Sequence, residues 1–143
     1  MTEIALHSDD LPEHGLLMEV EVIPSIAFIQ ANGYAREEIP TVRVRALFDT
    51  GAKLCAVDRS VIEALQVEPY KVATIQTPFH KQDSEVYLLT FRIPGEREYF
   101  PVTAVVADLS DDVCKAIIGR DFLQYCTLVY DGPTESGRLI VHP

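Results

Sequence analysis

The tripeptide Asp49-Thr50-Gly51 has the residue types and the order that best suit catalysis in this sequence. It directly follows the apolar residues 46–48, so its carboxylate stands at the end of a buried segment, where an unused acid is costly. Thr50 supplies a hydroxyl that can brace a sharp turn, and Gly51 lets the backbone approach closely or adopt a positive φ. The pattern therefore predicts a carboxylate held in a fixed position.

Three interpretations of this tripeptide compete. Asp, Thr and Gly are common turn formers, so an ordinary turn at the end of a strand is the simplest. The second is a phosphoryl-accepting Asp or a phosphate-binding loop, but this chemistry needs an ion site and many Gly and Lys residues, and neither is nearby. The third is the acid of an aspartic peptidase. The tripeptide alone does not decide among them.

A second apolar run lies about seventy residues further along the chain. Residues 115–123 read Lys-Ala-Ile-Ile-Gly-Arg-Asp-Phe-Leu, and residues 47–52 read Leu-Phe-Asp-Thr-Gly-Ala. In this order and at this separation, the two segments resemble the retroviral-type (retropepsin-like) aspartic proteases, as a single-domain cellular or bacterial member. The tail at residues 124–130, Gln-Tyr-Cys-Thr-Leu-Val-Tyr, extends the resemblance, which covers about residues 40 to 130. It implies a mainly β, closed β-barrel-like acid protease fold with one or two short helices, assembled as a homodimer.

The resemblance also implies roles for residues of this chain. Asp49 is the expected catalytic acid, and Thr50 and Gly51 are expected to support its loop. Other residues are expected to bind substrate from the groove floor and from a flap that closes over the peptide: Gly51, Ala52, Lys53, Thr77, Pro78, Phe79 and His80. A third group is expected to be structural at the site: Ile118, Gly119 and Arg120.

The sequence departs from the pattern of this family at two places. The expected flap tip, at residues 77–84, contains no glycine, whereas flap tips in the family are usually rich in it. Lys53 stands where the family usually has an acid that pairs with the arginine matching Arg120. Because two cations do not pair, either Asp121 or Asp58 is expected to pair with Arg120 instead.

An aspartic peptidase needs two carboxyls around one water. One takes a proton from the water, and the other donates a proton to the developing oxyanion. Like charges so close do not both ionise, so the two groups share a proton and titrate as a pair. The sequence contains only one Asp-Thr/Ser-Gly, so an identical subunit is expected to supply the second Asp49, with Thr50 bonding across the two-fold axis. No metal or other cofactor is expected, because the two carboxyls activate the water themselves.

The bulk composition fits one globular domain. The chain has 143 residues, of which 48% are hydrophobic and 24% charged, enough to bury a core without disulfides. Its formal charge of −10 argues against nucleic acid or a membrane surface as a partner, because both need a basic face. Residues 1–15 are acidic and are expected to form a flexible leader, followed by a single domain over residues 16–143.

The cysteines and the N-terminus bear on location. Cys55, Cys114 and Cys126 form no CxxC pair, so small core residues in a reducing compartment are expected rather than disulfides or zinc ligands. The N-terminus has acids but no Lys or Arg before Arg36, unlike a signal peptide, and no apolar run is long enough to span a membrane. A cytoplasmic location is expected.

Hydrophobic periodicity predicts mostly strands. Alternation marks residues 18–22 and 42–48, an apolar strand is expected at 25–30, and Asn32-Gly33 is the strongest hairpin signal. Ser60 and Glu63 have the spacing of a capping box at the start of a short helix. The other expected elements are strands at 54–57, 71–76, 85–93 and 99–107, a short helix at 120–125, and a hairpin of 127–130 with 138–141.

The expected function is hydrolysis of peptide bonds in an extended polypeptide by an obligatory homodimer. The alternative is a catalytically weak or inactive protease-like dimer that binds peptides or joins partners, because one fold can host several functions. The glycine-free flap and Lys53 favour this alternative, and the intact Asp49-Thr50-Gly51 favours the enzyme. An unrelated β-rich domain is the third possibility.

Overall fold

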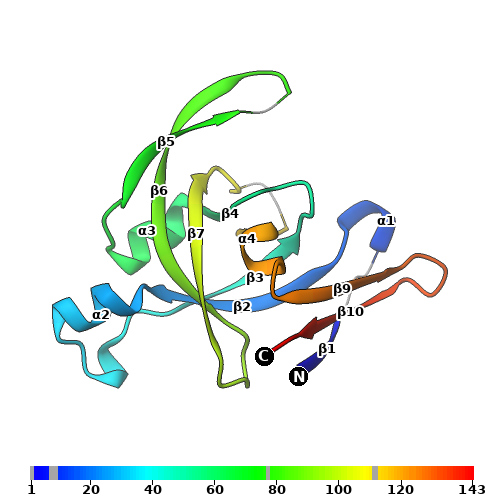
Figure 1. The fold of residues 1–143 in the computed structure, drawn as a ribbon, viewed down its shortest axis with the longest axis horizontal. Helices are drawn as coiled ribbons and strands as arrows, with labels where there is room; N and C mark the ends of the chain where they lie inside the picture. Colours follow the sequence, from blue (N-terminus) through cyan, green and yellow to red (C-terminus); the bar gives the residue numbers. More distant parts are fainter. Residues whose placement is uncertain (1, 7–9, 77, 111–112) are drawn as a thin grey trace.

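The computed structural model describes residues 2–6, 10–76, 78–110 and 113–143. The fold is mainly β and is built from two sheets and short helices (Figure 1). The larger sheet contains β2 (Leu17–Pro24), β3 (Val42–Phe48), β4 (Cys55–Asp58), β5 (Lys71–Gln76), β6 (Lys81–Arg92), β7 (Tyr99–Ala107) and β8 (Ala116–Ile118). The smaller sheet contains β1 (Thr2–Leu6), β9 (Cys126–Asp131) and β10 (Ser136–Val141). The helices are α1 (Leu11–His14), α2 (Ile26–Asn32), α3 (Arg59–Leu65), α4 (Arg120–Leu123) and a 3-10 turn at Arg36–Glu38.

The strand order of the larger sheet is β2-β3-β8-β4-β7-β6-β5, and β2 also pairs with β6. Six of the strands therefore form a ring, and β5 extends it at one side. Within the ring, β3 and β8 run parallel, with Phe48 opposite Ile118. Parallel neighbours end at the same edge of the sheet, so the residues that follow β3 and β8 meet there.

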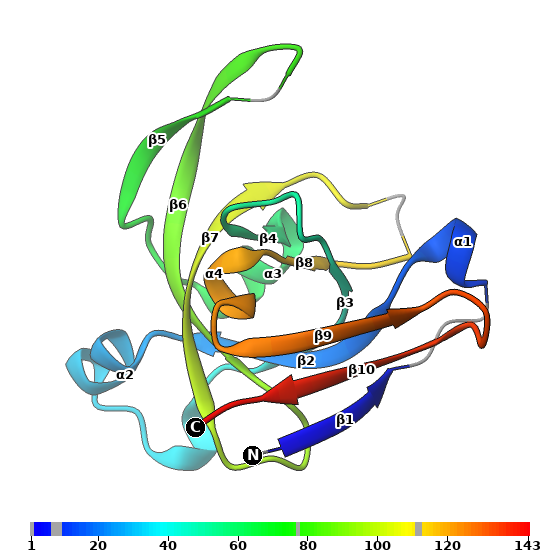
Figure 2. The ribbon, with the colours of Figure 1, turned by 45° about the vertical axis from the view of Figure 1, so that its right-hand side comes forward.

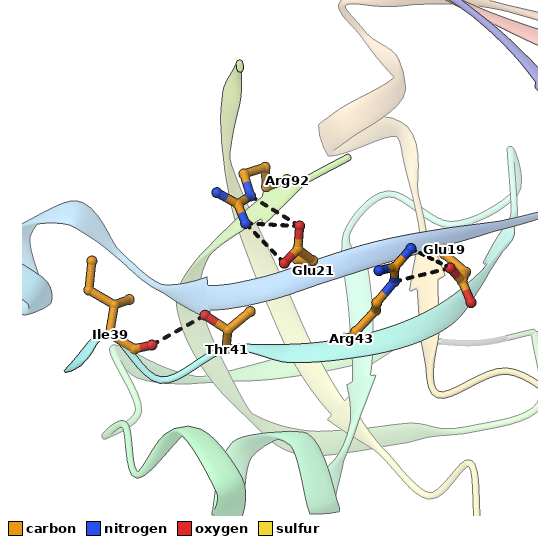
Figure 3. Close-up of polar contacts among 6 residues, drawn as sticks. All are labelled: Glu19, Glu21, Ile39, Thr41, Arg43 and Arg92. Carbon is orange, nitrogen blue, oxygen red and sulfur yellow. Dashed lines mark hydrogen bonds and ion pairs between the residues drawn. The ribbon is translucent and has the colours of Figure 1, made fainter. Parts of the chain in front are cut away.

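The alternating charges of β2 lie on the outer surface of the ring, as the sequence predicted (Figure 3). Val20 and Val22 are fully buried, whereas Glu19 and Glu21 point outward. Arg43 of the neighbouring β3 lies 2.8 Å from Glu19, and Arg92 of β6 makes a forked contact with Glu21 at 2.9 Å. These ion pairs join β2 to its two neighbouring strands, β3 and β6.

Phenylalanines from β6, β7 and α4 join the core beneath the helix. Phe122 of α4 is 1% exposed, and its ring centroid lies 4.9 Å from that of Phe100 in an edge-to-face contact. Phe91 packs on the other side of Phe122 at 6.5 Å. The apolar face of α4 thus anchors the segment that follows β8 to the core.

Two parts of the N-terminal region differ from the sequence-based expectation. The expected flexible leader includes β1, which pairs with β10 from Thr2 opposite Val141 to Leu6 opposite Gly137; residues 1 and 7–9 lie outside the described part. Leu6 and Leu11 are buried, because they complete the core below the smaller sheet. The region is mostly acidic, so its few apolar residues did not indicate a strand. They form a buried face only because β1 pairs with β10.

The expected strand and hairpin at 25–33 are wrong, because this segment forms helix α2. The Ser25 hydroxyl oxygen accepts a hydrogen bond from the Phe28 N–H at 3.2 Å, and Gly33 ends the helix with a left-handed φ of 63°. Asn32-Gly33 is therefore a helix C-terminus, a position that needs the same backbone conformation as a tight hairpin. None of the described helices combines the length and the apolar character needed to cross a membrane.

The hairpin of β5 and β6 projects away from the ring in both views (Figures 1 and 2). Six residue pairs join the two strands, from Lys71 opposite Val86 to Gln76 opposite Lys81. The strands match the expected flap arms, and the second arm begins earlier than expected, at Lys81.

Candidate active site

Asp49 lies where the sequence placed it, immediately after β3. Its N–H donates to the carbonyl of Ile118 at 2.9 Å, which continues the parallel pairing of β3 with β8 by one further bond. The residue is half-buried, between the buried Phe48 and the exposed Thr50. The sheet therefore fixes the backbone of the acid, while part of its side chain stays accessible.

The turn after Asp49 fixes the carboxylate itself. The Gly51 N–H donates to Oδ1 of Asp49 at 2.9 Å, and the Ala52 N–H donates to the Asp49 carbonyl at 3.2 Å. A Cβ on Gly51 would lie 3.1 Å from Oδ1, which is a tight contact. The three residues form a compact turn that holds one carboxylate oxygen and, among the described residues, leaves Oδ2 without a hydrogen-bond donor.

Gly119 lets a second segment pack directly against this loop. A Cβ at this position would lie 2.2 Å from the Leu54 carbonyl oxygen and 2.9 Å from that of Ala52. The next two N–H groups donate to the loop as well, Arg120 to the Ala52 carbonyl at 2.8 Å and Asp121 to the Lys53 carbonyl at 3.0 Å. Gly119 therefore allows the close approach of the two chain segments.

The expected ion pair of Arg120 with Asp121 or Asp58 is not formed. Arg120 Nη1 instead donates to the carbonyl of Thr50 at 2.7 Å. Asp121 Oδ2 accepts from the Thr103 N–H at 2.7 Å, and Asp58 Oδ1 accepts from the Leu109 N–H at 2.8 Å. Backbone groups already occupy both carboxylates, so the guanidinium binds a backbone carbonyl of the loop instead.

The sequence matches the model of the aspartyl protease family over residues 30–122, which is more than half of the chain and includes both segments of the site. The chain belongs to the aspartyl protease family. No curated protein is significantly similar to it in sequence.

Solved structures with the same fold include a retropepsin-like aspartic protease from Rickettsia conorii. It is 17% identical, with a TM-score of 0.60 over 96% of this chain and 90% of that chain. The protease of Simian Foamy Virus is 16% identical, with a TM-score of 0.49 over 76% of this chain and 92% of that chain. The retropepsin-like, mainly β fold predicted from the sequence is confirmed.

The tip of the β5–β6 hairpin, the expected flap, carries an exposed aromatic ring. Thr77 lies outside the described residues, whereas Pro78, Phe79 and His80 form the connection between β5 and β6. Phe79 is 93% exposed, and Nε2 of His80 lies 3.3 Å from Oε1 of Gln82. These tip residues belong to the hairpin and not to the loop that holds Asp49.

Sequence reasoning missed the role of Asp58 at the end of β4. Its side chain is the N-cap of α3 and also accepts from the Leu109 N–H, so it ties the loop after β7 to the helix. Hydrogen bonds from the Ser60 hydroxyl and from Leu109 lower the pKa of Asp58. The expected Ser60–Glu63 capping box is wrong, because Asp58, two residues before Ser60, caps the helix; this acid was the available signal.

Lys115 also supports the loop that follows β7. Its ammonium donates to the carbonyls of Leu109 and Ser110 at 2.8 and 2.9 Å, and its own N–H donates to the Arg45 carbonyl. The loop after β7 is therefore fastened to the strand that delivers Ile118. Nothing in the sequence indicated this contact, which depends on the pairing of β8 with β3.

A surface cavity of about 380 Å³ lies beside the catalytic loop. Its lining combines one loop residue with α4 and β9: Thr50, Arg120, Leu123, Gln124, Cys126 and Leu128. Burial raises the pKa of the Cys126 thiol to about 11, and that of Cys55 also to about 11, so both stay neutral thiols at physiological pH. No group of three or more metal-ligating side chains occurs among the residues that the structure describes.

Proposed function

We propose that the chain is an aspartic endopeptidase in which two Asp49 carboxyls, one from each subunit of a homodimer, activate a water. The observation that carries this proposal is the half-buried Asp49, held from three sides by Gly51, Ala52 and Ile118 in a member of the aspartyl protease family. A carboxylate fixed by its own backbone and by the neighbouring strand is preorganised for proton transfer.

The reaction uses the two carboxyls in different protonation states. The ionised carboxylate takes a proton from the water as its oxygen attacks the peptide carbonyl carbon, and the protonated carboxyl donates its proton to the carbonyl oxygen. When the tetrahedral intermediate collapses, the C–N bond breaks, the leaving nitrogen takes the proton from the carboxyl that the water protonated, and a hydroxyl of the intermediate returns a proton to the other carboxylate. The Gly51 N–H holds Oδ1 in place and leaves Oδ2 to face the water.

The requirement for two copies follows from the content of one chain. The sequence has one Asp-Thr/Ser-Gly, and no other carboxylate of the described residues shares a hydrogen bond with Asp49. Thr50 is exposed next to the cavity of about 380 Å³, which supports this face as the place for the second copy. In the proposed dimer, Thr50 bonds across the two-fold axis and the two loops hold each other in place.

The proposed substrate is a polypeptide bound in an extended conformation across the dimer. Gly51, Ala52 and Lys53 form the groove floor, and the flap residues 77–80 cover the peptide from above. Ile118, Gly119 and Arg120 support the loop from below. The proposed location is cytoplasmic, and we propose no nucleic acid or membrane partner and no cofactor.

The second candidate is a protease-like dimer that binds peptides without cleaving them. The observation that favours it is the flap tip, which has no glycine and presents Phe79 at 93% exposure. A tip with Pro78 is stiffer than a glycine-rich tip and has one N–H fewer for substrate.

A digest of a diverse peptide library between about pH 4 and 7 tests the proposal, with Asp49→Asn as the matched variant. Asn keeps an oxygen acceptor for the Gly51 N–H, so the loop and the dimer are expected to survive while cleavage is lost. Analytical ultracentrifugation of both proteins measures the dimer. Cleavage that persists in Asp49→Asn, or an active monomer, contradicts the proposal, and binding without cleavage in the wild type favours the second candidate.

A further inference from the structure

A second cavity, of about 570 Å³, lies in the fork where the flap leaves the ring. The pairing of β6 with β7 ends at Val86 opposite Val105, and residues 81–85 of β6 pair only with β5. Figure 1 shows β6 continuing into the flap hairpin beyond the end of β7. The two diverging strands therefore turn unpaired backbone edges toward the cavity, and the start of α3 closes its third side.

The lining of this cavity is strongly acidic. It includes five carboxylates and one guanidinium, a formal charge of −4: Asp58, Glu63, Asp83, Glu85 and Asp108 against Arg59. Hydrogen bonds from the Ser60 and Ser110 hydroxyls lower the pKa of Asp58 and Asp108, so these two acids remain ionised at neutral pH.

Among the described residues that line the cavity, the one cation, Arg59, holds its partner weakly. Arg59 Nη1 lies 3.9 Å from Oε1 of Glu85, and the two side chains are 59% and 40% exposed. The Tyr87 hydroxyl donates to the other oxygen of Glu85 at 3.1 Å. A contact this long and this exposed contributes little, so a better-placed cation can displace the Arg59 side chain.

Ser84 independently indicates a polar guest. The residue is 9% exposed and lines the cavity, yet its hydroxyl has no hydrogen-bond partner among the residues that the structure describes. Buried hydroxyls in proteins are nearly always hydrogen-bonded, because an unpaired one loses its contact with water without replacement. The hydroxyl can accept a hydrogen bond from a donor inside the cavity.

We propose that this fork binds a small organic cation with several N–H donors, of the alkylamine or guanidinium class. A bare metal ion is a poorer match, because the described residues offer no group of three or more metal-ligating side chains and the space holds a larger guest. An amine or a guanidinium binds the exposed carboxylates of Glu63, Asp83 and Glu85, the Ser84 hydroxyl and the free strand edge together. No residue of the loop 49–53 lines the fork, so this binding goes beyond the proposed proteolysis and does not require it.

The position of the fork predicts an effect on the flap. A guest in the cavity contacts Glu63 of α3, Asp108 after β7 and residues 82–85 at the root of the hairpin. It therefore bridges the fixed body and the projecting arm, and it restricts the hinge between them. Bound cation is expected to slow hydrogen exchange of the amides at residues 82–85.

Isothermal titration calorimetry with spermidine and, separately, with arginine methyl ester tests the proposal on the full chain. Glu63→Gln is expected to weaken binding roughly fivefold, because it removes one charge-assisted contact. Ser84→Ala is expected to weaken it roughly threefold, and Arg59→Met to strengthen it, because the competing cation is lost. Glu37→Gln is the matched control, since it removes the same charge from an exposed residue outside the cavity.

Equal weakening by Glu63→Gln and Glu37→Gln would show a general charge effect and overturn the proposal. Absence of binding by both probes overturns it as well, as does binding that Arg59→Met weakens. Circular dichroism of each variant confirms folding, and a preference for spermidine over arginine methyl ester distinguishes a free polyamine from an arginine side chain. The Asp49→Asn protein binds equally well if the proposal holds, so its failure and that of the proteolysis are separately visible.

Discussion

The Asp49 loop and the β5–β6 hairpin, the proposed catalytic loop and flap, are held in opposite ways. Residues 49–53 form hydrogen bonds with a segment about seventy residues further along the chain. In that segment the partners are Ile118, Arg120 and Asp121. The projecting parts of the hairpin, residues 71–76 and 81–85, bond chiefly to each other, and the Thr74 hydroxyl donates to Asp83 Oδ1 across the hairpin at 2.8 Å. One region is fixed by tertiary contacts, and the other by its local hairpin.

This difference suits the two tasks of the proposed peptidase site. The acid must stay within hydrogen-bonding distance of a water, so its loop belongs to the packed body. The cover must admit and release a polypeptide, so it belongs to an element with few contacts to the body. Changes in the loop are therefore expected to affect folding and chemistry together, and changes in the flap only substrate binding.

The strongest test of the comparison is Gly119→Ala. The new Cβ would lie 2.2 Å from the Leu54 carbonyl oxygen, and backbone cannot yield as a flexible side chain does. We expect a loss of about 3 kcal/mol or more in the free energy of unfolding, with loss of cleavage. Urea denaturation measures it, and Gly132→Ala is the control, since its Cβ would meet only Tyr130 at 3.8 Å. Similar stability of the two variants would contradict the packed loop.

Asp58→Ala tests the side chain that joins the loop after β7 to helix α3. The change leaves the N–H groups of Ser60 and Leu109 without their acceptor in a site where Asp58 is only 6% exposed. We expect a loss of about 2 to 3 kcal/mol in the free energy of unfolding, by urea denaturation at pH 7. A loss below about 0.5 kcal/mol, typical of surface changes, would show that Asp58 does not hold the two elements together.

The same residue predicts a pH dependence of stability. The folded-state pKa of Asp58 is lowered from its ordinary value of 3.8, so its stabilisation is present above that pH and is lost as the pH falls below it. The stability difference between the wild type and Asp58→Asn should therefore be constant near neutrality and shrink below about pH 4. Denaturation curves at several pH values measure it, and a difference that grows on acidification would have the wrong sign.

Arg120→Met has a smaller expected effect, on the loop alone. It removes the bond from Nη1 to the Thr50 carbonyl at 2.7 Å and keeps much of the aliphatic stem. We expect roughly tenfold slower peptide cleavage with less than about 1 kcal/mol lost in stability, because the exposed bond orients Thr50 more than it supports the fold. Unchanged kcat would show that Ile118 and Gly51 suffice to place the loop.

Phe79→Ser should have the smallest effect on the fold and a selective effect on substrate. The ring is 93% exposed, so its loss is expected to change the free energy of unfolding by less than about 0.5 kcal/mol. Steady-state kinetics should show a raised KM with kcat little changed, because the ring serves the bound peptide and not the dyad. A drop in kcat equal to that of a loop variant would remove the distinction between the two regions.

The sequence predicted most of the ring because its strands carry their own pattern. The bounds of β3, β5 and β7 match the expected ranges, and α3 and α4 lie where the helical segments were expected. The prediction failed where one local signal fits two structures. Asn32-Gly33 ends a helix here, and the apolar residues of β1 are too few to be recognised without β10.

The sequence by itself identified the acid, its turn and the glycine of the close approach, because each depends on the residue type at one position. Only the tertiary structure decided which groups those residues bind. Parallel pairing of β3 with β8 brings Arg120 to the Thr50 carbonyl, and parallel pairing of β4 with β7 brings Asp58 to the Leu109 N–H. Hydrogen-bond partners depend on distance in space, and no pattern along the chain contains that information.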